Sequence, residues 1–222
     1  MAEKHKKLSK KEIIMREAEK IFAEKGYYHT TVRDIARASD SNIAMLYYYF
    51  SDKENLYLEI LDRTFSKIHE IIGISIQKGV TYEEKIRLLI SSYIQFLGTK
   101  QDTARIIAWE MIEGGKFVPR IVERYFAPNF KNFQDIFKKG MEEDVFNSLD
   151  AELTPFSMIG MIVFFFFSAP VIKRILAMKT YDKPFMERLI GHTINLFFNG
   201  LMKTGAKESS PINQYMEQRH EK

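Results

Sequence analysis

Signals for the start of a helix recur along this sequence and constrain its fold more than any other feature. Three pairs of residues have the spacing of a capping box: Ser9 with Glu12, Ser51 with Glu54, and Thr81 with Glu84. In such a box a hydroxyl and a carboxylate satisfy free amides of the first helical turn. Behind each box apolar residues return every three or four positions, and no segment alternates as a strand does. The pattern therefore predicts an all-α chain.

Composition excludes several classes of protein. The chain has 222 residues, of which 45% are hydrophobic and 28% charged, as in an ordinary globular protein. It has no cysteine, which excludes a disulfide-stapled scaffold, a thiolate zinc site and a cysteine nucleophile. The five histidines are scattered without metal-ligand spacing, and no catalytic triad or carboxylate pair stands out. We therefore predict no metal, no cofactor and no catalytic site.

The N-terminus carries much of the basic character of the chain. The net charge of +4 is too small to identify a nucleic-acid binder by itself. A basic arm would suit a polyanion, although a solvated tail explains the same residues equally well. The apolar run and cleavage site of a signal peptide are missing, so we expect a cytoplasmic protein. The clustered lysines are Lys4, Lys6, Lys7, Lys10 and Lys11.

One apolar stretch resembles a membrane span in length. Residues 153–172 carry no charge, and a spanning helix needs about 20 mainly apolar residues. Pro155 and Pro170 break both ends, however, which leaves a shorter helix between them. We favour a buried core or interface helix, and a membrane-associated protein stays as an alternative.

The segment from about Thr31 to Phe50 has the dimensions of a helix-turn-helix, with Asn42 as the cap of its second helix. Such a second helix can enter the DNA major groove, which is about 12 Å wide. The hydroxyls of Thr30 and Thr31, beside free amides at a helix start, suit a phosphate oxygen. The segment therefore predicts a DNA-binding unit.

Three consecutive tyrosines support this interpretation. Leu46 and Phe50 are four residues apart and are expected to face a small core. Tyr47–Tyr49 span about 200° of a helix, so at least one must be exposed, and we expect it to contact DNA. Lys53 lies at the next helix start, where its charge opposes the helix dipole. A contact with a phosphate would explain that position.

Four sequence segments, in this order and spacing, resemble the TetR family of bacterial transcriptional regulators. The resemblance covers roughly residues 12–56, and beyond them only size and helical layout agree. It implies an all-α homodimer that represses transcription at a palindromic operator until a ligand releases it. The segments are Phe22-Ala23-Glu24-Lys25-Gly26-Tyr27, Thr30-Thr31-Val32-Arg33-Asp34-Ile35-Ala36, Leu46-Tyr47-Tyr48-Tyr49-Phe50 and Lys53-Glu54-Asn55-Leu56.

The resemblance also implies a domain organisation. We expect a basic arm at 1–11 and a helix-turn-helix domain at 12–56. A C-terminal helical domain for ligand binding and dimerisation follows at 57–204, with a polar tail at 205–222.

The turn departs from the family pattern. Where the family often has Ala-Gly-Val-Ser-x-Gly, this chain has Ser39-Asp40-Ser41-Asn42-Ile43-Ala44. Asp40 replaces a turn glycine, and a short polar residue tolerates the left-handed backbone region better than most. We therefore expect the turn to survive.

Base readout is implied by the family positions that face DNA. They match Ile43, Ala44 and Met45, whose apolar side chains suit thymine methyl groups, and Arg33, the candidate for a guanine contact. The predicted DNA-binding set is Thr30, Thr31, Arg33, Asn42, Ile43, Ala44, Met45, Tyr47, Tyr48, Tyr49 and Lys53.

Aromatic and methionine side chains in the middle helices suggest an apolar effector pocket between the connecting helix, about 51–78, and the bundle. Most such residues are more often core, and a solvated carboxylate is the commoner interpretation of Glu110. The predicted ligand-binding set is His69, Tyr93, Phe96, Trp109, Glu110, Tyr125, Phe126, Phe130, Met158 and Met161.

Two aromatic helices fit the four-helix dimer interface that the resemblance implies. The predicted interface set is Phe164, Phe165, Phe167, Phe197, Phe198 and Leu201. A helical small-molecule-binding protein or enzyme without DNA binding remains the other alternative.

Overall fold

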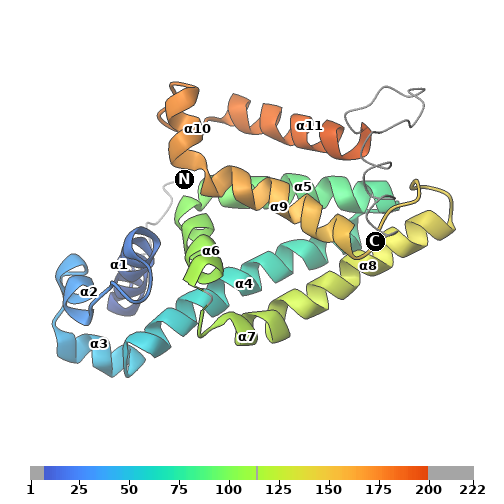
Figure 1. Cartoon of the computed structure of the whole chain (residues 1–222). Coiled ribbons are helices and arrows are strands. Elements are labelled where there is room, and N and C mark those ends of the chain that lie inside the picture. The colour runs from blue at the N-terminus through green and yellow to red at the C-terminus, as the bar shows by residue number, and fades with distance from the viewer. Residues whose placement is uncertain (1–7, 114, 200–222) are drawn as a thin grey trace, which may run out of the picture.

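The computed structural model describes residues 8–113 and 115–199, and these form helices without any strand (Figure 1). The expected all-α fold is therefore confirmed. The elements are α1 (Lys10–Lys25), α2 (Val32–Ala38), α3 (Ile43–Phe50), α4 (Lys53–Lys78), α5 (Tyr82–Thr99), α6 (Gln101–Glu113), α7 (Val118–Ile121), the π-helical turn η1 (Val122–Phe126), α8 (Ala127–Glu142), α9 (Leu153–Phe167), α10 (Ala169–Ile175) and α11 (Lys183–Asn199).

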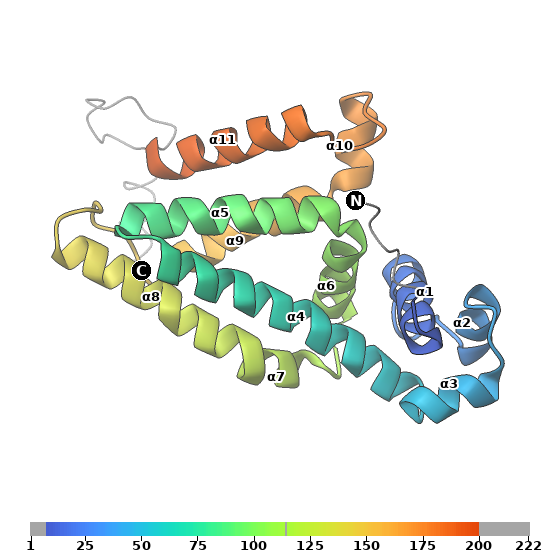
Figure 2. The same ribbon diagram turned by 180° about the vertical axis from the view of Figure 1, so that it is seen from behind.

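Helices α1, α2 and α3 form a small unit at one end of the molecule, and α4 runs from it into the body (Figures 1 and 2). Ile14 and Phe22 of α1, Ile35 of α2, and Leu46 and Phe50 of α3 are all buried. Since these residues come from three short helices, the unit has its own apolar centre. Its boundary falls within α4, which also packs against α5 in the body.

Side-chain caps start several of the helices as expected. Both hydrogen bonds of a capping box are present for Ser9 with Glu12 and for Thr81 with Glu84. The cap of α4 is Asp52 rather than the predicted Ser51: the amide of Asn55 donates to Asp52 Oδ1 at 2.7 Å. Ser51 has a φ of 66° and ends α3 instead. The positive φ of Ser51 turns the chain between α3 and α4, so the side chain of Asp52 lies at the start of α4.

Prolines stand in the first turn of α7, α8 and α10. The turn η1 precedes Pro128, whose ring nitrogen cannot donate a hydrogen bond to the helix. A wider π-turn accommodates the missing bond, so the α-helical hydrogen-bond pattern is interrupted between α7 and α8. At the start of α9, Asp150 Oδ1 accepts from the amides of Glu152 and Leu153.

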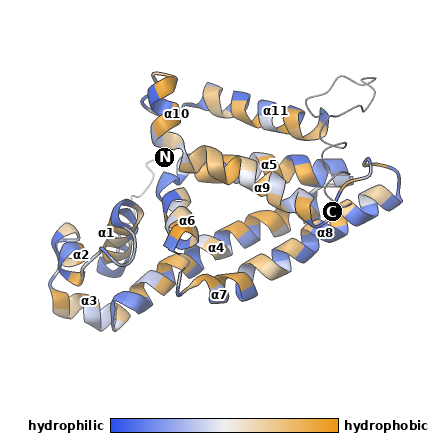
Figure 3. Cartoon of the chain, viewed as in Figure 1, coloured by the Kyte–Doolittle hydropathy of each residue, from blue (hydrophilic) through white to orange (hydrophobic). Residues whose placement is uncertain are grey.

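The most apolar helix packs within the body. Helix α9 lies over α5 and α6, and hydrophobic colour covers most of it in Figure 3. Its inner face buries Met158, Ile162 and Phe166. No single helix in the described ranges is long and apolar enough to cross a membrane; α9 and α10 meet that test only together, and they are bent by 66°.

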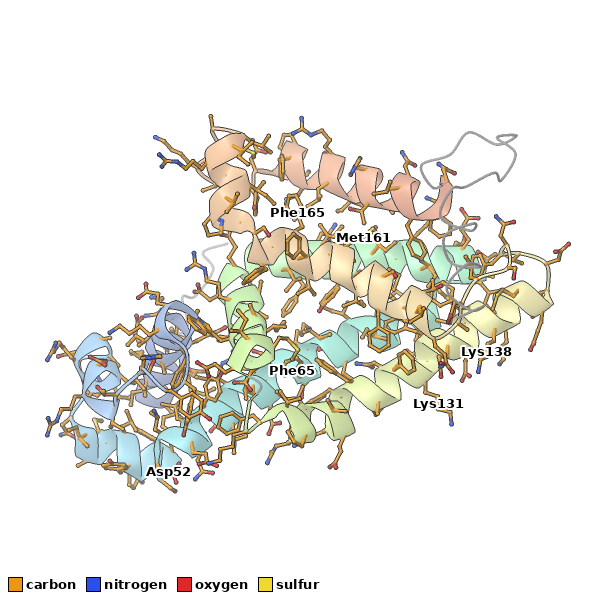
Figure 4. All side chains as sticks on the ribbon, in the orientation of Figure 1. Asp52, Phe65, Lys131, Lys138, Met161 and Phe165 are labelled. Atoms are coloured by element: carbon orange, nitrogen blue, oxygen red, sulfur yellow. The ribbon has the colours of Figure 1, made fainter. Side chains whose placement is uncertain are left out.

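The cap of α4 gives a first prediction. Replacing Asp52, which Figure 4 labels at the junction of α3 and α4, by alanine leaves the amide of Asn55 without its acceptor. We expect Asp52→Ala to lower the free energy of unfolding by about 1 kcal/mol, measured by urea denaturation. The control is Ser51→Gly, which should preserve or raise stability because glycine favours a positive φ. Equal losses in the two variants would contradict the assignment of the cap.

Candidate nucleic-acid interface

Local hydrogen bonds build the helix-turn-helix. Thr31 and Asp34 form a capping box at the start of α2. The amide of Met45 donates to Asn42 Oδ1 at 2.7 Å, so Asn42 caps α3 as predicted. Between them Asp40 has a φ of 47°, which confirms that it takes the left-handed conformation of the turn. These caps fix where α3 begins.

A lysine from α1 holds the turn in place. Lys10 Nζ donates to the carbonyl oxygens of Ser39 at 3.0 Å and Asp40 at 2.5 Å. These carbonyls lie at the C-terminal end of α2, where a positive charge is favourable. Lys10 therefore stabilises the turn. Lys11 forms an ion pair with Glu59 at 2.8 Å, while Lys4, Lys6 and Lys7 of the predicted basic arm lie outside the described residues.

Helix α3 presents one face to the core and the opposite face to solvent. Leu46 and Phe50 are buried, as expected. Ile43, Tyr47 and Tyr48 are exposed, and Tyr48 is the most open of them at 82%. Ala44 is exposed beside them, whereas Met45 and Tyr49 are half-buried at the edges. The outer face is therefore apolar at its start and phenolic at its end.

Arg33 lies on the neighbouring helix with its side chain in solvent. It forms no ion pair with any other described residue. An unpaired arginine on the exposed side of α2 is available to a phosphate or to a base edge. Thr31 is exposed too, but its hydroxyl is engaged with the carboxylate of Asp34 at 2.8 Å.

Two residues of the predicted DNA-binding set face inward instead. Thr30 is buried, and its hydroxyl donates to the carbonyl of Gly26 at 2.7 Å. Lys53 Nζ donates to the carbonyl oxygens of Tyr27 and Thr30, each at 2.9 Å. It also lies 4.2 Å from the centre of the Tyr27 ring. The phosphate contacts predicted for Thr30 and Lys53 do not fit this geometry, because internal acceptors already hold both groups.

Comparison with known proteins agrees with this architecture. Residues 14–60 match the family of bacterial regulatory proteins called tetR, and residues 82–201 match the C-terminal domain of the HTH-type transcriptional dual regulator CecR. The chain belongs to the TetR family. It is 22% identical to the probable HTH-type transcriptional regulator YttP of Bacillus subtilis, over 90% of this chain and 97% of that protein.

Solved structures share the fold. The regulator PfmR from Thermus thermophilus superposes with a TM-score of 0.72 at 19% identity, covering 89% of this chain and 100% of that one. The structure of AibR in complex with isovaleryl coenzyme A and operator DNA gives 0.69 at 17% identity, covering 86% and 98%. At this identity the likeness establishes the fold and nothing further.

The structure does not gather the predicted ligand residues of this TetR protein into one pocket. Tyr93 and Met158 are in the core, and Met161 is exposed. His69 Nδ1 pairs with Asn129 at 2.8 Å, and the hydroxyl of Tyr125 donates to Asp62 Oδ1 at 3.1 Å. These contacts join α4 to α8 and η1. Phe126 and Phe130 are half-buried, Phe96 lines one cavity and Trp109 lines a second, smaller one.

Some of the predicted dimer residues face solvent, and others pack within their own chain. Phe164 and Phe167 are exposed. Phe165 instead packs against Tyr181 and Phe185 of its own chain. Phe197 packs against Phe137, and Phe198 lies under the guanidinium of Arg87. Leu201 lies outside the described residues.

Glu110 is buried rather than solvated, against the commoner interpretation of a helix carboxylate. It is 1% exposed, and its Oε1 accepts from the hydroxyl of Tyr57 at 2.6 Å. Its Oε2 has no hydrogen-bond partner among residues 8–113 and 115–199. Burial raises the pKa of Glu110, because a charged carboxylate is poorly solvated there. The hydrogen bond between Tyr57 and Glu110 joins α4 to α6.

The pH dependence of stability tests this assignment. Above pH 4.5 the unfolded chain releases the Glu110 proton while the folded chain retains it, so stability is full below that pH and falls as pH rises through the folded pKa. We expect Glu110→Gln to flatten this decline in melting temperature as pH rises above about 4.5.

The exposed Glu123 of η1 provides a control, because it is not among the groups that act on Glu110. Glu123→Gln should leave the pH profile close to that of the unmodified chain. An unchanged slope in Glu110→Gln would show that the carboxyl of Glu110 is not the titrating group.

Proposed function

We propose that this chain is a cytoplasmic, homodimeric repressor that binds a palindromic operator and is released by an apolar small-molecule effector. The observation that carries the proposal is the outer face of α3, where Ile43, Tyr47 and Tyr48 are exposed while Leu46 and Phe50 anchor the helix. Exposed apolar and phenolic groups on a short, firmly capped helix suit a major groove. In this proposal residues 12–56 read DNA and residues 57–204 bind effector and dimerise.

Each residue of the outer face has a proposed partner on DNA. Ile43, Ala44 and Met45 would contact thymine methyl groups, and Arg33 would reach a guanine. The hydroxyls of Tyr47 and Tyr48 would meet phosphates. The amides at the start of α2, beside Thr31, would bind a further phosphate oxygen.

An apolar stripe on α9 supports dimerisation. Its exposed residues recur at helical spacing and continue onto α10. A contiguous exposed apolar patch on a single chain is typical of an interaction surface. We propose that it pairs with its symmetry mate, and that the exposed side of α11 borders the pair. The exposed residues are Leu153, Phe156, Met161, Phe164, Phe167, Val171 and Ile175.

Dimerisation sets the spacing of the two recognition helices. Two copies of α3 must lie about 34–36 Å apart to enter successive major grooves. An effector releases the DNA only if it binds more tightly to a dimer in which the two α3 helices lie at a different separation. Because α4 joins α3 to the body without a break, movement of α4 is the proposed mechanical link.

Operator binding can be tested with DNA that flanks the gene of this protein. We expect Arg33→Ala to relax preference at one base pair by about 1–3 kcal/mol. Tyr48→Phe should weaken all sequences alike, by roughly tenfold, through loss of one phosphate contact. Gel shifts with a salt titration measure both effects.

The control removes a positive charge far from α3. Lys131 points away from the body on α8 (Figure 4), so Lys131→Ala should bind as the unmodified chain does. Uniform weakening by Arg33→Ala would assign the arginine to phosphate alone. Absence of salt-dependent binding would instead favour a helical ligand-binding protein without DNA.

The proposed dimer interface gives a separate prediction. A glutamate in place of Phe164, which is 66% exposed, would bury a charge in an apolar contact. We expect Phe164→Glu to be monomeric at micromolar concentration by light scattering. Val80 is 87% exposed at the far end of α4, so Val80→Glu is the control and should remain dimeric. Identical masses for both variants would contradict the interface.

A further inference from the structure

A cavity lies between the helix-turn-helix unit and the body. Its volume is about 580 Å³, within the range of small-molecule sites. One wall is α1, which contributes Met15, and the other walls are α4, α5 and α6. Ile60 and Phe96 supply further apolar surface, and Thr64 and Thr103 add hydroxyls. The cavity therefore differs from the apolar pocket expected within the bundle, because α1 of the helix-turn-helix unit forms part of it.

Four basic residues line the cavity; two of them are paired with carboxylates and two are not. Lys67 pairs with Glu70 at 2.8 Å, and Arg16 pairs with Glu17 at 3.1 Å. Arg63 on α4 and Lys100 at the end of α5 form no ion pair with any described residue, although both line the cavity.

We propose that this cavity binds an anionic amphiphile, a carboxylate or phosphate on a flexible apolar chain, and that this ligand is the effector. Its headgroup would lie between Arg63 and Lys100, and its chain would lie along Met15, Ile60 and Phe96. The inference rests on the proposed function for its regulatory consequence. The binding site itself stands on the cavity and its charges.

The position of the cavity explains how such a ligand would act. A molecule that fills it touches α1 on one side and α4 with α6 on the other. It therefore binds with different affinity to arrangements that differ in the separation of these helices. That difference is the requirement for shifting a conformational equilibrium.

Three acidic residues, Glu12, Glu19 and Glu70, also line the cavity, so the sign of the ligand charge needs a test. Glu19 lines the cavity near Arg63 and Lys100. Burial raises the pKa of Glu19, and the two cations oppose this effect. Glu70 is paired with Lys67, and Glu12 closes the capping box of α1, so Arg63 and Lys100 are the cavity cations that have no ion pair with a described residue. These two charges favour an anion.

A series of probes with one chain and four headgroups tests the proposal by calorimetry on the full-length protein. Octanoate and octyl phosphate should bind, 1-octanol should bind at least about tenfold more weakly, and octylammonium should bind weakest. The first two probes separate carboxylate from phosphate sources. Equal or tighter binding of octylammonium, or no binding of any probe, would overturn the proposal.

Variants locate the site. Arg63→Gln and Lys100→Gln should each weaken the preferred anion by roughly tenfold while leaving the affinity for 1-octanol unchanged. Lys138 points outward from α8 (Figure 4), so Lys138→Gln should bind as the unmodified chain does. Equal affinities in all three variants would place the anion elsewhere.

Gel shifts without and with the anionic probes separate this inference from the proposed function. If operator binding occurs and the anions weaken it, the cavity is the effector site. If the chain does not bind DNA but binds the anions through Arg63 and Lys100, the proposed function fails and the binding site stands. Anion binding that leaves operator affinity unchanged would refute the effector role.

Discussion

The contact between α1 and α6 holds the helix-turn-helix unit against the body, and the orientation of the DNA-binding face depends on it. Trp109 Nε1 donates to the carbonyl of Ala23 at 3.1 Å, across 86 residues of sequence. Beside it Gly26 ends α1 with a φ of 74°. A Cβ at Gly26 would lie 2.7 Å from Glu113 Oε1 and 3.2 Å from the Trp109 ring. Glycine therefore satisfies both the backbone conformation and the close approach of the two helices.

The two sides of α1 differ in chemistry. Towards the C-terminal end of α6 the junction is aromatic: Tyr57 contacts the rings of Phe22, Tyr27 and Phe117. On the other side α1 borders the cavity that contains Arg63. The dense side is suited to act as a pivot, since packed rings resist separation. The open side is where a ligand could change the angle of α1.

The sequence predicts what depends on neighbouring residues and misses what depends on distant ones. Helix starts were predictable because a cap needs only residues three apart, and even the error at α4 moved the cap by one position, from Ser51 to Asp52. Lys53 required knowledge of carbonyls more than 20 residues away. Glu110 left a local signal, since it follows buried Thr103 and Ile107 at helical spacing. The cavity left none, because residues of four helices line it.

The apolarity of α9 is explained by contacts on more than one side. A helix that is hydrophobic all round is normally buried all round. Here Met158, Ile162 and Phe166 are buried, whereas Phe164 and Phe167 are open to solvent in the single chain. The bend of 66° after α9 is a poor fit to a straight span, and it turns α10 across the end of the body. In the proposed dimer a second copy of the chain would cover this stripe at the same residues on both sides, so one apolar sequence would serve the core and the interface together.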